Sequence, residues 1–233
     1  MCRLFAIISK IPVKPNYWLL EARHSILELS KEHKHGWGLA LLENRKIHLK
    51  KSAIPAYKDK SFHAYAQLIQ TNLCLVHIRK AINGKVKLEN TQPFVRGKWF
   101  FAHNGIIRGY RELLHLINIK YLSGDTDSEI FFNLLMKNMK SFCIELALPQ
   151  TIADISKYCD YTSLNCIISD CNKLYALCDY KRELRYYTLH YLKTDRYVIV
   201  SSEKIGTAGK WQKMKNHELL RVDKKLNIQK ISI

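Results

Sequence analysis

A cysteine directly follows the initiator methionine, a position in which one residue can supply two reactive groups. Small second residues such as cysteine permit removal of Met1, and we expect that removal, which makes Cys2 the N-terminal residue. Its thiolate is then a nucleophile, and its own α-amino group, with an ordinary pKa of about 7.7 to 8.0, can carry protons without a histidine partner. The alternative is that Cys2 is a small residue entering a strand, since a reactive thiol needs a supporting environment. The position of Cys2 alone does not distinguish a nucleophile from a small residue at the start of a strand.

Further short motifs follow Cys2-x-Leu-Phe in a fixed order. They are Gly36-Trp37-Gly38, His77-Ile78-Arg79-Lys80-Ala81, Asn90-Thr91-Gln92-Pro93-Phe94, Phe101-Ala102-His103-Asn104-Gly105-Ile106-Ile107 and Gly124-Asp125-Thr126-Asp127-Ser128-Glu129. Each motif is weak alone, but in this order and at this spacing the set resembles the class II glutamine amidotransferases, which are N-terminal-nucleophile hydrolases. The chain is most similar to the stand-alone branch, which has no fused synthase and includes members related to γ-glutamyl peptide cleavage. The resemblance extends from Cys2 to about residue 211.

The resemblance implies a role for each of five residues. Cys2 is the expected nucleophile, Asn104 and Gly105 hold the oxyanion, Arg79 binds the substrate α-carboxylate, and Asp127 accepts its α-ammonium group. The residue types suit these roles, because a guanidinium holds a carboxylate with two hydrogen bonds and amide N–H groups stabilise an oxyanion. Ordinary alternatives exist: a surface salt bridge, an Asn-Gly turn, and an acid at a helix N-terminus.

The implied reaction is cleavage of a γ-glutamyl amide through a Cys2 thioester, with release of glutamate and of ammonia or an amine. No metal or organic cofactor is expected. Free glutamine is one candidate substrate, with ammonia passed to a separate ammonia-accepting enzyme, and a γ-glutamyl peptide or conjugate is another. A hypothesis of a different class is a catalytically inactive basic protein that binds a polyanion.

Three departures from the resembling families concern loops and substrate choice rather than the nucleophile. Relatives of the stand-alone branch carry Asp-Gly-Trp-Gly where this chain has His35, and Asn-Thr-His-Pro-Phe where it has Gln92. After Arg79, the run Lys80-Ala81-Ile82-Asn83 lacks the Trp-Ala-Thr-His of the sugar-phosphate amidotransferases. Carboxylate contacts of that branch are therefore not carried over.

Hydrophobic periodicity predicts the elements that must position these residues. Strands are expected at 3–9, 37–43, 46–50, 73–79, 98–103, 162–169, 173–179, 185–191 and 196–201, with a turn at Asn44-Arg45, and helices at 16–32, 61–70, 106–117, 127–139 and 151–158. Thr126-x-x-Glu129 is a capping box that begins the fourth helix. Strict β-α-β alternation is missing, which favours α+β organisation with antiparallel sheets. The resemblance implies a four-layer α/β/β/α sandwich, formed by residues 2–233 as one domain.

Composition narrows the class of protein further. The chain has 233 residues, 47% of them hydrophobic, with no membrane-helix-sized apolar run and no signal-peptide pattern. Seven cysteines without a C-x-x-C pair indicate reduced thiols and a cytoplasmic protein, and the histidine and cysteine spacing does not predict a metal site. The net charge of +18 is spread in short groups, which favours solvated basic surface over nucleic-acid binding. His77 and His103, in predicted buried strands, are expected to be structural, and the oligomeric state stays open.

Overall fold

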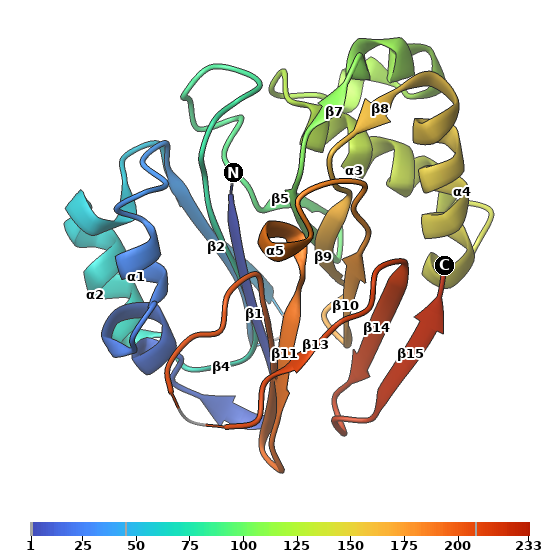
Figure 1. Ribbon diagram of the computed structural model, residues 1–233. Coiled ribbons are helices and arrows are strands. Elements are labelled where there is room, and N and C mark those ends of the chain that lie inside the picture. Colours follow the sequence, from blue (N-terminus) through green and yellow to red (C-terminus); the bar gives the residue numbers. More distant parts are fainter. Residues whose placement is uncertain (1, 45, 208) are drawn as a thin grey trace.

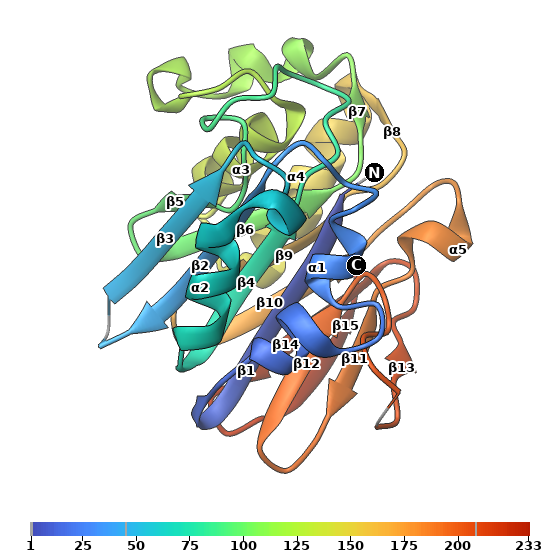
Figure 2. The same ribbon diagram turned by 90° about the vertical axis from the view of Figure 1, so that its left-hand side faces the viewer.

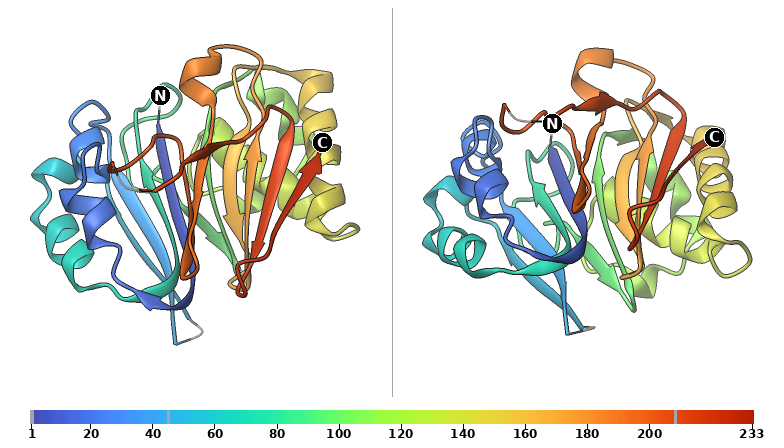
Figure 3. Two further views of the ribbon diagram at one scale, coloured as in Figure 1. Left: turned by 60° about the horizontal axis from the view of Figure 1, so that its bottom comes forward. Right: turned by 90° about the horizontal axis from the view of Figure 1, so that it is seen from below.

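The computed structural model describes residues 2–44, 46–207 and 209–233 and arranges them in four layers (Figure 1). Two antiparallel sheets pack face to face. Helices α1 (Ile26–Leu29) and α2 (Lys60–Leu68) cover one sheet, and α3 (Asp127–Asn138) and α4 (Ile144–Tyr158) cover the other. The views along the sandwich show the two helical layers on opposite outer faces (Figure 3). The predicted α/β/β/α sandwich is therefore confirmed.

The first sheet has seven strands in the order β13-β11-β12-β1-β4-β2-β3. Their bounds are β1 (Arg3–Val13), β2 (Trp37–Glu43), β3 (Lys46–Ser52), β4 (Thr71–Ile78), β11 (His190–Lys193), β12 (Tyr197–Ser201) and β13 (Gln212–Lys213). The start of β1 pairs with the end of β4, since Arg3 lies opposite Ile78 and Leu4 opposite His77. This register brings Cys2 beside the residues that follow β4. Figure 2 views this sheet from the side that α1 and α2 cover.

The second sheet has six strands in the order β15-β14-β10-β9-β6-β5. Their bounds are β5 (Phe94–Arg96), β6 (Trp99–Asn104), β9 (Asn165–Ser169), β10 (Lys173–Cys178), β14 (Glu218–Asp223) and β15 (Ile228–Ser232). A separate pair, β7 (Ile107–Arg108) and β8 (Asp160–Tyr161), lies beyond the end of β6. Figure 1 shows this pair at the same end of the sandwich as the start of β1.

Alternation along the strands divides the apolar side chains between the layers. In β1, Leu4 and Ala6 belong to the core between the sheets, whereas Phe5 and Ile7 belong to the core beneath α1 and α2. By the same alternation, Cys2 falls on the inter-sheet side. In β6, Ala102 faces the inter-sheet core, and so Asn104, two residues on, falls on that side as well.

Several sequence predictions needed correction. The helix expected at 16–32 is divided into one turn of π-helix, η1 (Tyr17–Glu21), and α1, with His24 at φ +57° between them. The helix expected at 106–117 is wrong at its start, where β7 forms before the 3₁₀ helix η3 (Tyr110–Leu116). The strand expected at 185–191 is wrong over its first part, because α5 (Leu184–Tyr187) precedes β11.

Other predictions held with shifted ends. The helix expected at 151–158 begins earlier, at Ile144, and the fourth helix begins as the capping box predicts, with the Thr126 side chain accepting a hydrogen bond from the Glu129 amide. Strands β14 and β15 were not predicted, and Arg45 of the predicted turn lies outside the described residues. Within the described ranges, no helix is long and apolar enough to cross a membrane.

Candidate active site

A cleft lies at the end of the sandwich where β1 begins and β4 ends. Four of the five predicted site residues line it, namely Cys2, Arg79, Gly105 and Asp127. They come from four separate segments: the start of β1, the end of β4, the turn after β6 and the first turn of α3. Asn104, the fifth, is fully buried at the end of β6 and directly precedes Gly105.

The Cys2 thiol is partly exposed and contacts the main chain of the residue that follows Arg79. The Lys80 amide donates to Sγ at 3.4 Å, and the Lys80 carbonyl oxygen lies 3.7 Å from Sγ. Burial raises the pKa of the Cys2 thiol, while the Lys80 amide and the Arg79 guanidinium act in the opposite direction. The predicted removal of Met1 concerns a residue outside the described ranges.

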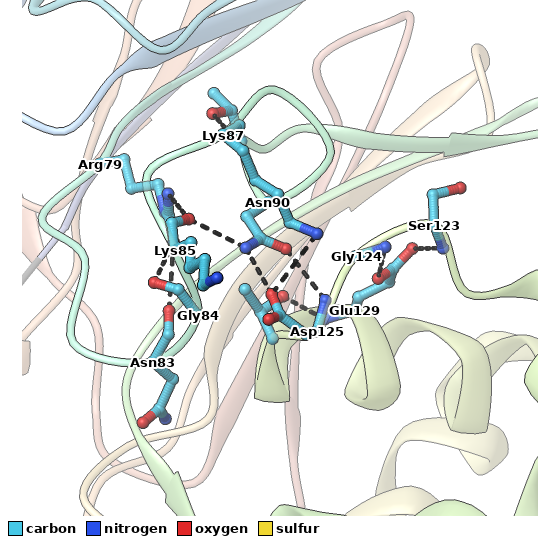
Figure 4. Close-up of polar contacts among 12 residues, drawn as sticks. Arg79, Asn83, Gly84, Lys85, Lys87, Asn90, Ser123, Gly124, Asp125 and Glu129 are labelled. Carbon is cyan, nitrogen blue, oxygen red and sulfur yellow. Dashed lines mark hydrogen bonds and ion pairs between the residues drawn. The ribbon is translucent and has the colours of Figure 1, made fainter.

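The Arg79 guanidinium is buried and is held by a loop of the main chain (Figure 4). It donates to the carbonyl oxygens of Lys85, Asn83 and Gly84 at 3.0, 3.1 and 3.3 Å. Burial lowers the pKa of Arg79, and the charges of Cys2 and of nearby aspartates oppose that shift. Because the side chain is only 3% exposed and lines the cleft, the surface salt bridge considered from the sequence is wrong.

Hydrogen bonds join this loop to the start of α3 (Figure 4). Asn90 donates to the Asp125 carboxylate at 2.5 Å and accepts from the Asp125 amide at 3.0 Å. The Glu129 carboxylate accepts the amides of Ser123 and Gly124 at 2.7 and 2.8 Å. The loop after Arg79 and the turn before Asp127 are thereby fixed to each other.

Asn104 and Gly105 form a turn between two strands rather than the expected strand-to-helix turn, because β7 follows. Both polar side-chain atoms of Asn104 are buried and have no hydrogen-bond partner in the described part of the chain. A buried amide group without a partner is costly, so this side chain is a candidate for contact with a substrate oxygen. A Cβ at Gly105 would lie 1.8 Å from the Ser163 carbonyl oxygen, so only glycine fits the observed turn.

The Asp127 carboxylate connects α3 to the turn that follows Gly105. Its side chain is 4% exposed, lines the cleft, and accepts the amides of Ile107 and Ser128 at 2.9 and 3.0 Å. The residue is thus more than an exposed acid at a helix N-terminus, and its carboxylate lies in the same cleft as the Arg79 guanidinium.

Two positions at which the chain departs from its resembling family support the cleft walls. The His35 Nδ1 atom accepts the Ala81 amide at 2.8 Å, and the Gln92 Oε1 atom accepts the His103 amide at 2.6 Å. Neither residue was predicted to be part of the site. Their departure from the family pattern was the only indication in the sequence, because both hydrogen bonds join segments that are distant along the chain.

Two histidines near the cleft are buried. His103 bonds through its ring nitrogens to the Ser128 hydroxyl at 2.9 Å and the Ser163 carbonyl oxygen at 3.1 Å. Both ring nitrogens of His77 are buried without a hydrogen-bond partner among the described residues. Burial lowers the pKa of both rings, that of His77 to about 3, and holds them neutral. Their structural role stays a prediction.

Three histidines, of which His77 and His33 are buried and His190 is partly buried, predict a loss of stability in mild acid. Burial lowers the pKa of His77 to about 3 and the pKa values of His33 and His190 to about 4, from an ordinary 6.5. Between the folded and the unfolded pKa values, the unfolded chain binds protons that the folded chain does not. These histidines therefore leave the free energy of unfolding undiminished above about pH 6.5 and lower it progressively as the pH drops. Urea titrations at about pH 7.0, 5.5 and 4.5 measure this, and an unchanged unfolding free energy at all three would contradict it.

A metal centre is not assembled in the described part of the chain. Over residues 2–44, 46–207 and 209–233, no three His, Cys, Asp or Glu side chains are grouped so that they could hold an ion.

Comparison with known proteins identifies relatives of the chain. An uncharacterized protein of Methanocaldococcus jannaschii, MJ1515, is 30% identical over 204 residues, which are 83% of this chain and 54% of the relative. The gamma-glutamyl-hercynylcysteine sulfoxide hydrolase of Mycobacterium tuberculosis is 33% identical over 73 residues, 31% of each protein. The chain spans about half the length of the first curated relatives it matches.

The fold has a close structural counterpart. A glutamine aminotransferase class-II domain protein from Silicibacter pomeroyi superposes with a TM-score of 0.77 at 21% identity, covering 100% of this chain and 99% of that protein. The sequence pattern of the class-II glutamine amidotransferases matches residues 1–192. Since this match covers most of the chain, the protein belongs to the class II glutamine amidotransferase family.

Proposed function

We propose that residues 2–233 act as one domain that cleaves a γ-glutamyl amide through a thioester on Cys2. The observation that carries this proposal is the convergence of Cys2, Arg79, Gly105 and Asp127, from four distant segments, on one cleft. A nucleophile, a cation, an anion and a turn with amide donors are the groups that this reaction requires. The hydrolase among the relatives, named for a γ-glutamyl compound, gives independent support.

Two opposite charges in the cleft suit the amino-acid head of the substrate. In the proposed complex, the Arg79 guanidinium, held by three carbonyl oxygens, binds the α-carboxylate, and the Asp127 carboxylate binds the α-ammonium group. The γ-carbonyl then lies at Cys2. Because the loop and the turn are fixed before substrate arrives, little ordering entropy is lost on binding.

The proposed reaction has two steps. First, the Cys2 sulfur forms a bond to the γ-carbon, the C–N bond breaks, and the thiol proton passes through the α-amino group to the leaving nitrogen, so that ammonia or an amine departs. Water then attacks the thioester, the C–S bond breaks, glutamate leaves, and the thiol regains its proton. The Asn104 amide and the Gly105 N–H stabilise the oxyanion in both steps.

The proposed binding role of Asp127 predicts a loss of substrate affinity in Asp127→Asn. The amide oxygen of asparagine can still accept the Ile107 N–H, but the attraction to an ammonium group is lost, so kcat/KM for glutamate release falls about 10- to 100-fold, mainly through KM. Initial rates over a range of substrate concentrations measure this. Asp195→Asn, an exposed residue in the turn after β11, is the matched control and keeps the wild-type values. A normal KM in Asp127→Asn would contradict the role.

The direct test of the proposed function is product analysis. Protein with its N-terminus verified is incubated with glutamine or with γ-glutamyl methylamide, and glutamate, ammonia and methylamine are quantified. We expect one glutamate for each ammonia or methylamine, with no added metal. Absence of glutamate from every γ-glutamyl compound, together with salt-sensitive binding of nucleic acid, would favour the inactive polyanion-binding alternative instead.

The cellular setting is also proposed. All seven cysteines are free, which suits a reducing compartment, and we place the enzyme in the cytoplasm. If glutamine is the substrate, its ammonia can pass to a separate enzyme. If a γ-glutamyl conjugate is the substrate, hydrolysis is complete in itself.

A further inference from the structure

Lys80 lies at the mouth of the cleft, directly beside the nucleophile. Its amide and its carbonyl oxygen both contact Cys2 Sγ, at 3.4 and 3.7 Å. The adjacent side chains of an extended segment point in opposite directions, and the burial agrees: Arg79 is buried, whereas Lys80 is exposed. The buried Arg79 side chain thus lies at the inner end of the cleft, and the exposed Lys80 side chain offers a cation at the outer end.

The Lys80 ammonium is available to a ligand. In the ranges that the structure describes, no carboxylate lies within 4.0 Å of it. Two other cations lie near Cys2. Arg79 is buried and donates to three carbonyl oxygens, and Arg3 contacts Glu203 at 2.9 Å and the Cys2 carbonyl oxygen at 3.4 Å. Among the residues that line the cleft, Lys80 is therefore the exposed cation, outside the α-carboxylate site proposed at Arg79.

The charges of Arg3 and Lys80 both act on one buried histidine, His33. His33 is 2% exposed, and its pKa is lowered to about 4, first by burial and then by the charges of Arg3 and Lys80. The ring bonds through Nδ1 to the Leu29 carbonyl oxygen at 2.7 Å. Of these two positive charges, Arg3 is paired with Glu203, whereas Lys80 has no such partner among the described residues.

The direction of the substrate gives this cation a specific use. In the proposed complex, the amino-acid head lies at Arg79 and Asp127 and the γ-carbonyl at Cys2, which leaves the exposed Lys80 side of the cleft for a substituent on the leaving nitrogen. Glutamine has no such substituent, whereas a γ-glutamyl amino acid or peptide places a carboxylate there.

We infer that Lys80 recognises a carboxylate on the leaving group, so that the preferred substrate is a γ-glutamyl amino acid or peptide rather than free glutamine. This inference rests on the proposed function of the same cleft. The exposed Lys80 side chain would then determine substrate choice without acting on the reacting carbonyl.

The test compares two substrates that differ by one charge: γ-glutamylglycine and γ-glutamylglycinamide. We expect wild-type kcat/KM to favour the carboxylate by about tenfold, since charge-assisted contacts exceed neutral ones and partial exposure limits the gain. The ratio falls to a third or less of its wild-type value in Lys80→Met, falls further in Lys80→Glu, and is kept in Lys80→Arg. Comparing the ratio between variants removes the different intrinsic reactivity of the two amides. High salt lowers the wild-type ratio, because the contact is exposed.

Controls separate this inference from the function on which it rests. Lys137→Met, an exposed lysine near the far end of α3, keeps the wild-type ratio, and melting temperatures verify that each variant is folded. If Lys80→Met keeps the wild-type ratio, or if the wild type hydrolyses glutamine and the glycinamide as well as γ-glutamylglycine, the inference is wrong while the proposed function stands. If no γ-glutamyl compound is hydrolysed, both are wrong.

Discussion

Replacing Cys2 with alanine is expected to reduce glutamate release by about four orders of magnitude or more, because the proposed reaction uses no other nucleophile at the γ-carbonyl. The melting temperature is expected to change little. Cys2 is only partly buried, and its thiol makes two long contacts with the Lys80 main chain. Steady-state glutamate release and thermal unfolding of the same preparations measure both effects.

A second cysteine variant makes this prediction specific. Cys143→Ala removes an exposed thiol at the start of α4, remote in the fold from the cleft, and keeps both rate and stability. Cys2→Ser retains a hydroxyl of similar size and tests whether the thiol itself is required. Turnover by Cys2→Ala within tenfold of the wild-type rate would remove Cys2 from the mechanism.

Replacing Gly105 with alanine is expected to damage both activity and stability. The added Cβ would lie 1.8 Å from the Ser163 carbonyl oxygen and 2.7 Å from His103 Nε2, distances at which the main chain must shift. Overpacking of this kind costs about 1 to 3 kcal/mol or more. Displacing the oxyanion donors adds a loss in kcat of about 100- to 1000-fold. Single-turnover kinetics and urea unfolding measure the two effects separately.

The control is a glycine whose neighbourhood is open. At Gly97, in the turn between β5 and β6, φ is +58° and a Cβ would meet nothing within 4 Å. Asparagine tolerates that backbone conformation, so Gly97→Asn keeps wild-type activity. If Gly105→Ala lost stability but kept its kcat, the turn would be structural and the proposed oxyanion role would be contradicted.

Much of the fold followed from periodicity in the sequence. Strands such as β4 and β6 were predicted within two residues at each end, because their apolar alternation and burial agree. The capping box at Thr126 placed the start of α3 correctly, since that hydrogen bond is local. The four-layer arrangement came from the family resemblance, as periodicity alone indicated only antiparallel sheets with separate helices.

Other elements depend on contacts that a local pattern does not contain. The segment after Gly105 has helical apolar spacing, yet Ile107 pairs with Tyr161 of β8 and donates its amide to Asp127, and this tertiary pairing prevails over the helix. The supporting roles of His35 and Gln92 arise in the same way, from bonds to Ala81 and His103 across the cleft wall. Motif order predicted which residues meet, but the contacts that hold them needed the structure.

Mass spectrometry shows whether Cys2 is the nucleophile of a glutamyl-binding cleft. The intact mass of the purified protein is measured with and without an electrophilic glutamine analogue, and any adduct is mapped by peptide sequencing. We expect loss of Met1 and one adduct, on Cys2, that excess glutamine or γ-glutamylglycine blocks. Retention of Met1, a processed Cys2 that stays unmodified, or an adduct on another cysteine would show that Cys2 is not this nucleophile.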